Sequence, residues 1–237
     1  MPSPTTADIS KAVGTVLSVN VGTPREFDYR GRAARSAIWK TPVAGRLAAR
    51  GVNLAGDEQA DRGAHGGPDK AIYAYATEDT RFWEKEIGRP LEYGVFGENL
   101  TTEGFDVNDA LVGERWTVGT AVLEVSEPRI PCWRLGVRMN DSLFLRRFTA
   151  AMRPGAYLRI VSEGDVGASD EIRVRIAEKP ATDVTIRDVF RIYTRDRHEA
   201  ARLLAVPAMS EAWKSWAADF LQHAGSNQPA NAKVGCC

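Results

Sequence analysis

One cysteine of this sequence lies among residues that favour chemistry at its sulfur. Cys132 is part of the stretch PRIPCWRL, residues 128–135, and the other two of the three cysteines end the chain. Two prolines hold this stretch extended and exclude a helix across the residues between them. Arg129 and Arg134 flank the thiol, and nearby cations favour the thiolate, which is both a nucleophile and a metal ligand.

The sulfur of Cys132 admits two interpretations. A thiolate suits a soft or high-valent transition metal, and flanking arginines suit an anionic cofactor. A lone cysteine can instead be a small buried hydrophobic residue. The prolines and arginines around it favour the functional interpretation.

Two further loops carry polar residues that could take part in chemistry. His65 stands in the tripeptide HGG, where glycines let the backbone approach a ligand. Its charge changes near neutral pH, so it is a candidate proton donor, and a turn histidine that caps a backbone carbonyl is an equal alternative. Asn99 and Thr101, in VFGENLTTEG, offer an amide and a hydroxyl for hydrogen bonds, although Gly-Glu-Asn is also ordinary turn chemistry.

Short strands must position these loops. Alternating apolar residues predict a strand over residues 14–22, a broken hairpin over 35–49, a hairpin over 115–128 that turns near Gly119, and another over 156–178. Many short strands separated by Gly, Pro and Asp predict a barrel or a sandwich.

Helices interrupt and then replace these strands. Apolar residues at helical spacing predict helices over residues 78–87 and 142–152. After Pro180 glycine is absent until Gly225, and three helices that open on Thr, Asp or Ser are expected at 185–194, 196–206 and 210–222. A helix-turn-helix reader of DNA is the alternative, but mixed charges and the lack of a turn glycine favour a packing or docking module.

The composition sets limits on partners and location. Lysines plus arginines equal aspartates plus glutamates, 31 each, so no overall charge calls for nucleic acid or a membrane. No apolar run approaches the length of a membrane span, and we expect a cytoplasmic protein. Cys236 and Cys237 could suggest lipid attachment, but they follow a polar stretch typical of a disordered tail, expected over 225–237.

In these loops the sequence resembles the MOSC domain, the module shared with molybdenum-cofactor sulfurases and amidoxime-reducing molybdoenzymes. The resemblance is to the bacterial branch in which a three-helix domain follows. It covers roughly residues 14–176, and the matching stretches are SAIWKTPVAG, GDEQADRGAHGGPDKAIYAY, FGENLTTEG, VGERWTVGTAVLEVSEPRIPCWRL and GAYLRIVSEGDVGASDEI.

The resemblance implies a mainly β, barrel-like MOSC domain over residues 1–180, with a few peripheral helices, and a small three-helix domain over 181–224. It implies molybdenum cofactor in its molybdopterin form, with Cys132 as the metal ligand. Relatives in this branch are associated with detoxifying N-hydroxylated bases such as hydroxylaminopurine, so the implied activity is reduction of N-hydroxylated compounds to amines.

Further site residues follow from the resemblance as hypotheses. The residues expected to bind the cofactor beside Cys132 are Arg129, Arg134, Asn99, Thr101, Lys70 and Lys40. His65 would supply a proton to the leaving oxygen. The family usually has lysine where this chain has Arg134, and arginine keeps the charge but differs as a donor.

Electrons would come from a separate reductase, because no flavin, haem or iron–sulfur signature is present. The three-helix domain could dock that reductase or could simply cover the barrel edge. Two other functions remain open: sulfur transfer through a persulfide on Cys132, and a non-catalytic carrier of molybdopterin.

Overall fold

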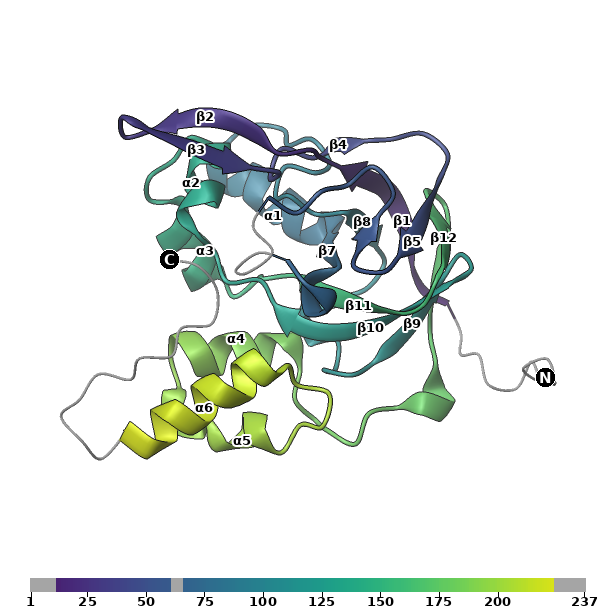
Figure 1. The fold of residues 1–237 in the computed structure, drawn as a ribbon, viewed down its shortest axis with the longest axis vertical. Helices are drawn as coiled ribbons and strands as arrows, with labels where there is room; N and C mark the ends of the chain where they lie inside the picture. The colour runs from purple at the N-terminus through teal and green to yellow at the C-terminus, as the bar shows by residue number, and fades with distance from the viewer. Residues whose placement is uncertain (1–11, 61–65, 224–237) are drawn as a thin grey trace.

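In the computed structural model, which describes residues 12–60 and 66–223, seven strands close into a barrel (Figure 1). Around the barrel they run in the order β13 (Glu171–Val174), β9 (Arg115–Val118), β10 (Ala121–Pro128), β11 (Ala156–Ser162), β7 (Ile72–Ala76), β8 (Leu100–Glu103) and β1 (Ala12–Val21). Pairing of β1 with β13 closes the ring, which leaves neither of these strands as an open edge. Neighbours are antiparallel except for β7 and β8, which run parallel.

Shorter strands lie outside the barrel. They are the hairpin of β2 (Arg25–Tyr29) and β3 (Arg32–Ser36), the strand β4 (Thr41–Pro42) paired with the end of β1, and a three-stranded sheet of β5 (Arg46–Arg50), β6 (Asn53–Leu54) and β12 (Gly164–Gly167). The β2–β3 hairpin extends from the barrel at the upper left of Figure 1.

Of the predicted hairpins, only the one over 115–128 is present, where β9 and β10 meet at the turn. The hairpin predicted over 35–49 is wrong, because β3 pairs with β2 and β5 pairs with β12. The hairpin predicted over 156–178 is also wrong, because β11, β12 and β13 each pair with other strands. Barrel closure favours partners distant in sequence, which local alternation cannot identify.

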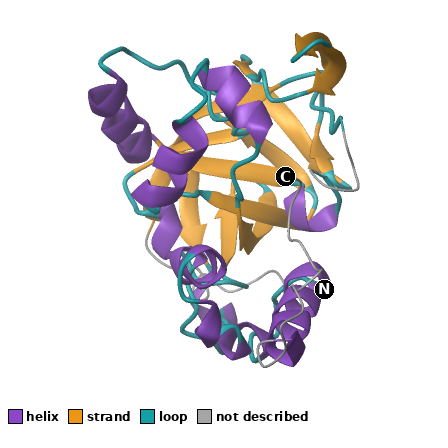
Figure 2. Ribbon diagram, turned by 90° about the vertical axis from the view of Figure 1, so that its left-hand side faces the viewer, coloured by secondary structure: helices purple, strands orange, loops and turns teal. Residues whose placement is uncertain are grey.

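Strand β7 is buried on both faces. Alternate side chains point to opposite sides of a strand, so Ile72, Ala74 and Ala76 join the core that fills the barrel. Tyr73 and Tyr75 face outward into a second core, which is closed by the helices α1 (Thr77–Ile87), α2 (Trp133–Met139) and α3 (Phe144–Ala151). Figure 2 shows the strands at the centre with helices against them.

The helices predicted over 78–87 and 142–152 are confirmed as α1 and α3. Helix α2 was not predicted, because it begins directly after the proline-stiffened loop and has only seven residues. The described ranges also contain the short 3-10 turns η2 (Pro68–Lys70), η3 (Val107–Asp109), η4 (Ile176–Glu178) and η5 (Arg197–Glu199).

The last described segment contains the three predicted helices, α4 (Ile186–Thr194), α5 (Ala201–Leu204, preceded by η5) and α6 (Glu211–His223). Thr185 begins α4 with a capping box: its side chain accepts from the backbone of Asp188, whose carboxylate accepts from the backbone of Thr185. The apolar side chains of these helices join those of the barrel in one continuous core. The prediction of a mainly β, barrel-like domain followed by three helices is therefore confirmed.

The longest described helix has 13 residues. Within residues 12–60 and 66–223, no helix combines the length and the apolar character that crossing a bilayer requires.

Candidate functional site

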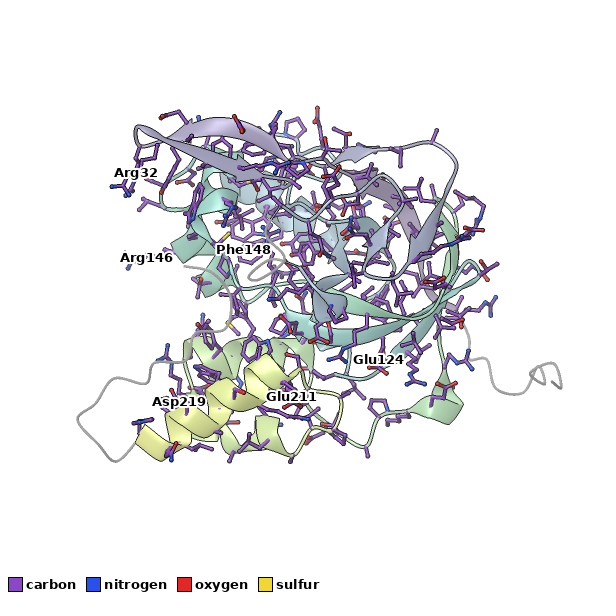
Figure 3. All side chains as sticks on the ribbon, in the orientation of Figure 1. Arg32, Glu124, Arg146, Phe148, Glu211 and Asp219 are labelled. Atoms are coloured by element: carbon purple, nitrogen blue, oxygen red, sulfur yellow. The ribbon has the colours of Figure 1, made fainter. Side chains whose placement is uncertain are left out.

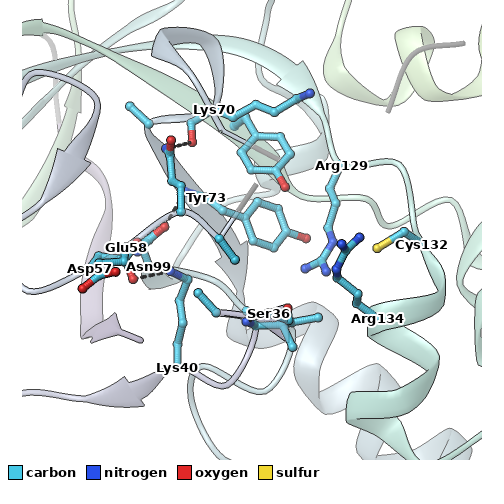
Figure 4. A pocket seen from close by; sticks show the side chains of 17 residues that line it. Ser36, Lys40, Asp57, Glu58, Lys70, Tyr73, Asn99, Arg129, Cys132 and Arg134 are labelled. Carbon is cyan, nitrogen blue, oxygen red and sulfur yellow. Dashed lines mark hydrogen bonds and ion pairs between the residues drawn. The ribbon is translucent and has the colours of Figure 1, made fainter. Parts of the chain in front are cut away.

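A pocket on the outer side of the barrel collects residues from distant parts of the sequence (Figure 4). It contains roughly 630 Å³ of space not filled by atoms, part of it open to solvent. Its walls come from the segments that follow β3, β6 and β10, from the turn η2, and from strands β7 and β11. Six residues expected from the sequence line it: Lys40, Lys70, Asn99, Arg129, Cys132 and Arg134.

Cys132 lies where strand β10 passes into helix α2. Pro128 ends β10, the next three residues are neither strand nor helix, and Cys132 is the extended N-cap residue of α2. The stiff loop expected from the prolines is therefore present. The thiol is buried, with 3% of the residue exposed, and Figure 4 shows its sulfur beside the guanidinium groups of Arg129 and Arg134.

Arg129 is a buried cation at the base of the pocket. It is 6% exposed, donates from Nη1 to the carbonyl oxygen of Phe96, and lies over the ring of Tyr73 with its Cζ 5.1 Å from the ring centroid. Burial opposes its charge, but the nearby hydroxyls of Tyr73 and Tyr157 and the thiol of Cys132 leave the pKa of Arg129 raised. The pocket floor therefore carries a permanent positive charge next to the thiol.

A second cation, Lys40, is held by a buried network. Its ammonium pairs with Oδ1 of Asp57, and the side chains are 9% and 3% exposed. Asp57 also accepts from the backbone N–H of Gly22 at 2.8 Å and from Nδ2 of Asn99 at 2.9 Å. Burial lowers the pKa of Lys40, and the charge of Asp57 acts in the opposite direction.

Asn99 lines the pocket, but its side chain binds within the protein. Its second amide hydrogen bond goes to the carbonyl oxygen of Asn20 at 3.2 Å, and its Oδ1 accepts from the backbone N–H of Tyr73 at 3.1 Å. The amide thus joins β1, β7 and the segment of Asp57, and it fixes the position of that carboxylate.

Thr101 is placed away from the pocket. It is fully buried, accepts from Nδ2 of Asn20 at 3.1 Å and donates to Oε1 of Glu98 at 3.0 Å. The carboxylate of Glu98 in turn accepts from the backbone N–H groups of Gly94 and Phe96, at 2.5 and 3.0 Å. Burial raises the pKa of Glu98 despite these bonds. Both residues hold the turn that precedes β8.

Lys70 reaches the pocket from the turn η2 and faces another buried carboxylate. Its Nζ lies 3.5 Å from Oε1 of Glu127, which is 2% exposed. The other oxygen of Glu127 accepts from Oγ of Ser210 at 2.9 Å. Because Ser210 directly precedes α6, the three-helix domain contributes to the surroundings of a pocket lysine.

Tyr157, on β11, is a pocket residue that sequence reasoning missed. Its hydroxyl forms no hydrogen bond with any residue that the structure describes. Burial raises the pKa of Tyr157 to about 12, although Arg129 acts against this shift. At neutral pH the hydroxyl is protonated and can donate a hydrogen bond into the pocket. The alternation of β11 alone could not have distinguished this face from the opposite one.

Three of the sequence-based candidates lie outside the described residues: His65, Cys236 and Cys237. Among residues 12–60 and 66–223, no group of three His, Cys, Asp or Glu side chains could hold a metal ion by itself.

The chain is similar to known proteins over most of its length. A family model described as the MOSC domain matches residues 61–173. The protein YflK of Bacillus subtilis (strain 168) is 32% identical over 204 residues, which cover 85% of this chain and 91% of YflK. A crystal structure of YiiM from Geobacillus stearothermophilus superposes with a TM-score of 0.72 at 30% identity, covering 88% of this chain and 99% of that one.

A third relative is longer. A protein named "Reductase" from Gibberella moniliformis (strain M3125 / FGSC 7600) is 31% identical over 198 residues, which make up 81% of this chain and 34% of that protein.

Proposed function

This chain belongs to the MOSC domain family, and we propose that it reduces N-hydroxylated compounds to amines with a molybdenum cofactor bound beside Cys132. The single observation that carries the proposal is the convergence of a buried thiol and several cations on one pocket. A protein named a reductase among the relatives supports an oxidoreductase. We propose that it acts in the cytoplasm on a small substrate, and not on nucleic acid or a membrane.

The donor set of the pocket fits such a group. Molybdopterin is an anionic pterin phosphate, and arginine and lysine are the side chains that bind phosphate best. A metal that brings sulfur ligands of its own needs few from the protein, and Cys132 offers one soft ligand. In the described part of the chain no three His, Cys, Asp or Glu side chains could hold a metal together, which agrees with a metal that takes only one ligand from the protein.

Each side chain then has a proposed task. Cys132 would bind the metal through its thiolate, which Arg129 stabilises from the pocket floor. Arg129 and Arg134 would neutralise the anionic cofactor, whereas Lys40 and Lys70, which each face a carboxylate of the protein, would donate hydrogen bonds to it. Asn99 and Asp57 would act indirectly, by fixing Lys40.

The proposed overall reaction is R–NH–OH + 2 e⁻ + 2 H⁺ → R–NH₂ + H₂O. The bound cofactor would supply the two-electron oxygen removal, and the N–O bond is the one that breaks. His65 is the proposed donor of the proton to the leaving oxygen. Tyr157 would hold the substrate or the cofactor by donating its hydroxyl hydrogen. The electrons would come from a separate reductase.

The test is the molybdenum content of Cys132→Ala. The protein is purified from a host that makes the cofactor, and metal is measured by mass spectrometry. We expect stoichiometric molybdenum in the wild type, loss in Cys132→Ala, and no loss in the control Cys236→Ala/Cys237→Ala, which removes the other two thiols. Hydroxylaminopurine reduction driven by reduced methyl viologen should fall in parallel.

Other outcomes would contradict the proposal. Molybdenum that is absent from the wild type, or that survives in Cys132→Ala, would exclude the thiolate as its ligand. A persulfide trapped on Cys132 would favour sulfur transfer instead. Bound molybdenum without any reductase activity would favour a carrier of molybdopterin.

A further inference from the structure

The β2–β3 hairpin carries arginines that the rest of the protein does not neutralise. Residues 25–35 contain four arginines and two carboxylates. Arg25, Arg30, Arg32 and Arg35 are all exposed, and none forms an ion pair with a described residue. By contrast, Arg115 on the barrel and Arg191 on α4 are each paired with carboxylates.

The hairpin is packed against the residue that follows the cysteine. The rings of Tyr29 and Trp133 are stacked, with centroids 4.2 Å apart, and Phe27 contacts Trp133 at 5.9 Å and Trp39 at 4.8 Å. Arg30 at the tip lies over the ring of Tyr29, 5.2 Å from its centroid. An unbroken set of side-chain contacts therefore leads from an exposed arginine to the neighbour of Cys132.

The same hairpin borders the pocket. The last residue of β3 and the two that follow it, residues 36–38, line the pocket that contains Cys132. Helix α2 adds positive charge beside it: Arg138 has a buried Nε without a hydrogen-bond partner in the described structure, and burial together with the charge of Arg25 lowers its pKa. Figure 3 shows Arg32 at the hairpin tip and Arg146 on α3 extending from the same side of the molecule.

We propose that the β2–β3 hairpin is the docking surface for an acidic protein that carries a flavin or an iron–sulfur cluster and delivers electrons to the Cys132 pocket. This inference rests on the proposed function. The four arginines outnumber the two carboxylates of the hairpin, and a net surface charge accelerates association with a partner of the opposite sign. The partner loses two electrons per turnover, and the N–OH substrate gains them with two protons, which completes the reaction given above.

The experiment uses reduced flavodoxin, a small acidic flavoprotein, as the electron-donating probe. The test variant is Arg30→Glu/Arg32→Glu in the full-length, cofactor-loaded protein. The control, Arg50→Glu/Arg197→Glu, makes the same change in net charge at two exposed arginines far from the hairpin, neither ion-paired with a described residue. Substrate reduction is followed with flavodoxin and, separately, with reduced methyl viologen, a small cation that needs no docking surface.

We expect the test variant to lose about tenfold to a hundredfold in the flavodoxin-driven rate at low salt, and the control to lose little. The wild-type rate should fall with added salt, and the viologen-driven rate should be maintained in all three proteins. Titration of flavodoxin against the proteins without substrate should show the same order of affinity, which gives a readout independent of turnover.

Several results would overturn the assignment. Equal losses in the test and control variants, or no salt dependence, would exclude the hairpin as the docking surface. Binding of duplex DNA that is lost in the same test variant, without an effect on flavodoxin, would assign the arginines to nucleic acid. A wild-type protein that methyl viologen cannot drive would contradict the proposed function itself, and this inference with it.

Discussion

Ser210 donates a hydrogen bond of 2.9 Å from Oγ to Oε2 of Glu127, and so joins the start of α6 to the end of the barrel strand β10. Burial raises the pKa of Glu127, and the ammonium of Lys70 acts in the opposite direction. The three-helix domain therefore supplies one of the donors that a buried carboxylate beside the pocket requires.

Ser210→Ala should lower the free energy of unfolding by about 1–3 kcal/mol, because it leaves an oxygen of the buried Glu127 without its donor. Denaturant unfolding followed by tryptophan fluorescence measures the change. Ser142→Ala, at an exposed serine in the loop before α3, is the matched control and should have little effect. Equal effects of the two substitutions would show that the bond to Glu127 does not stabilise the fold.

Asp57→Asn should destabilise the protein by about 3–5 kcal/mol, because the ammonium of Lys40 would remain buried without its counterion. Lys40→Met/Asp57→Asn removes both charges and should cost less than the sum of the two single substitutions. Urea unfolding of the four proteins forms a double-mutant cycle. Additive losses would indicate that the two charges do not interact.

Gly97→Ala should be more harmful than Gly88→Ala, although both positions have a left-handed backbone, with φ of +74° and +70°. Both substitutions carry the left-handed cost of about 1–2 kcal/mol. At Gly97 the new Cβ would also lie 2.9 Å from Cγ1 of Ile38 and 3.6 Å from Nη1 of Arg129, whereas open space surrounds it at Gly88. Thermal unfolding and molybdenum content, compared between the variants, isolate the pocket contact. Equal losses in Gly97→Ala and Gly88→Ala would contradict a role for this contact.

The hydrogen bonds from Arg191 and Arg202 lower the pKa of Glu199 to about 2. An acid whose folded-state pKa is depressed stabilises the fold above its unfolded pKa of about 4.3, and this contribution is lost as the pH falls towards 2. When the pH is lowered from 7 into the acidic range, the free energy of unfolding of Glu199→Gln should therefore fall less than that of the wild type. Unfolding measured by tryptophan fluorescence across this range tests the difference.

The control for Glu199 is Glu211→Gln, at a carboxylate on α6 whose side chain is 87% exposed. Its pH profile should follow that of the wild type. A Glu199→Gln profile that ran parallel to the wild type would mean that the arginines contribute nothing through this carboxylate.

The sequence was informative where residue type determines local conformation. Paired prolines predicted the stiff loop before Cys132, and Thr185 predicted the start of α4. Charge next to a thiol identified Arg129 and Arg134, which the fold brings to the same pocket as Cys132.

Residues that depend on long-range packing could not be found in this way. Glu127 is a carboxylate in a strand, a pattern typical of a solvent-facing position, yet it is buried, with Ser210 from the segment before α6 and Lys70 from η2 against it. The ion pair between Asp57 and Lys40 forms because the chain between them folds back, and their spacing in the sequence does not predict it. The wrong hairpins have the same origin, since strand partners in a closed barrel are chosen by geometry over the whole chain.

The pairing of β1 with β13, which closes the barrel, limits when the domain can fold during synthesis. Strand β1 pairs through residues 12–15 with residues 171–173 of β13, so the first strand waits for its partner while the whole domain is synthesised. Domains fold as units during synthesis, and distant pairings form late. The ring can therefore close only after β13 has left the ribosome, and until then the N-terminal end of β1 lacks this partner.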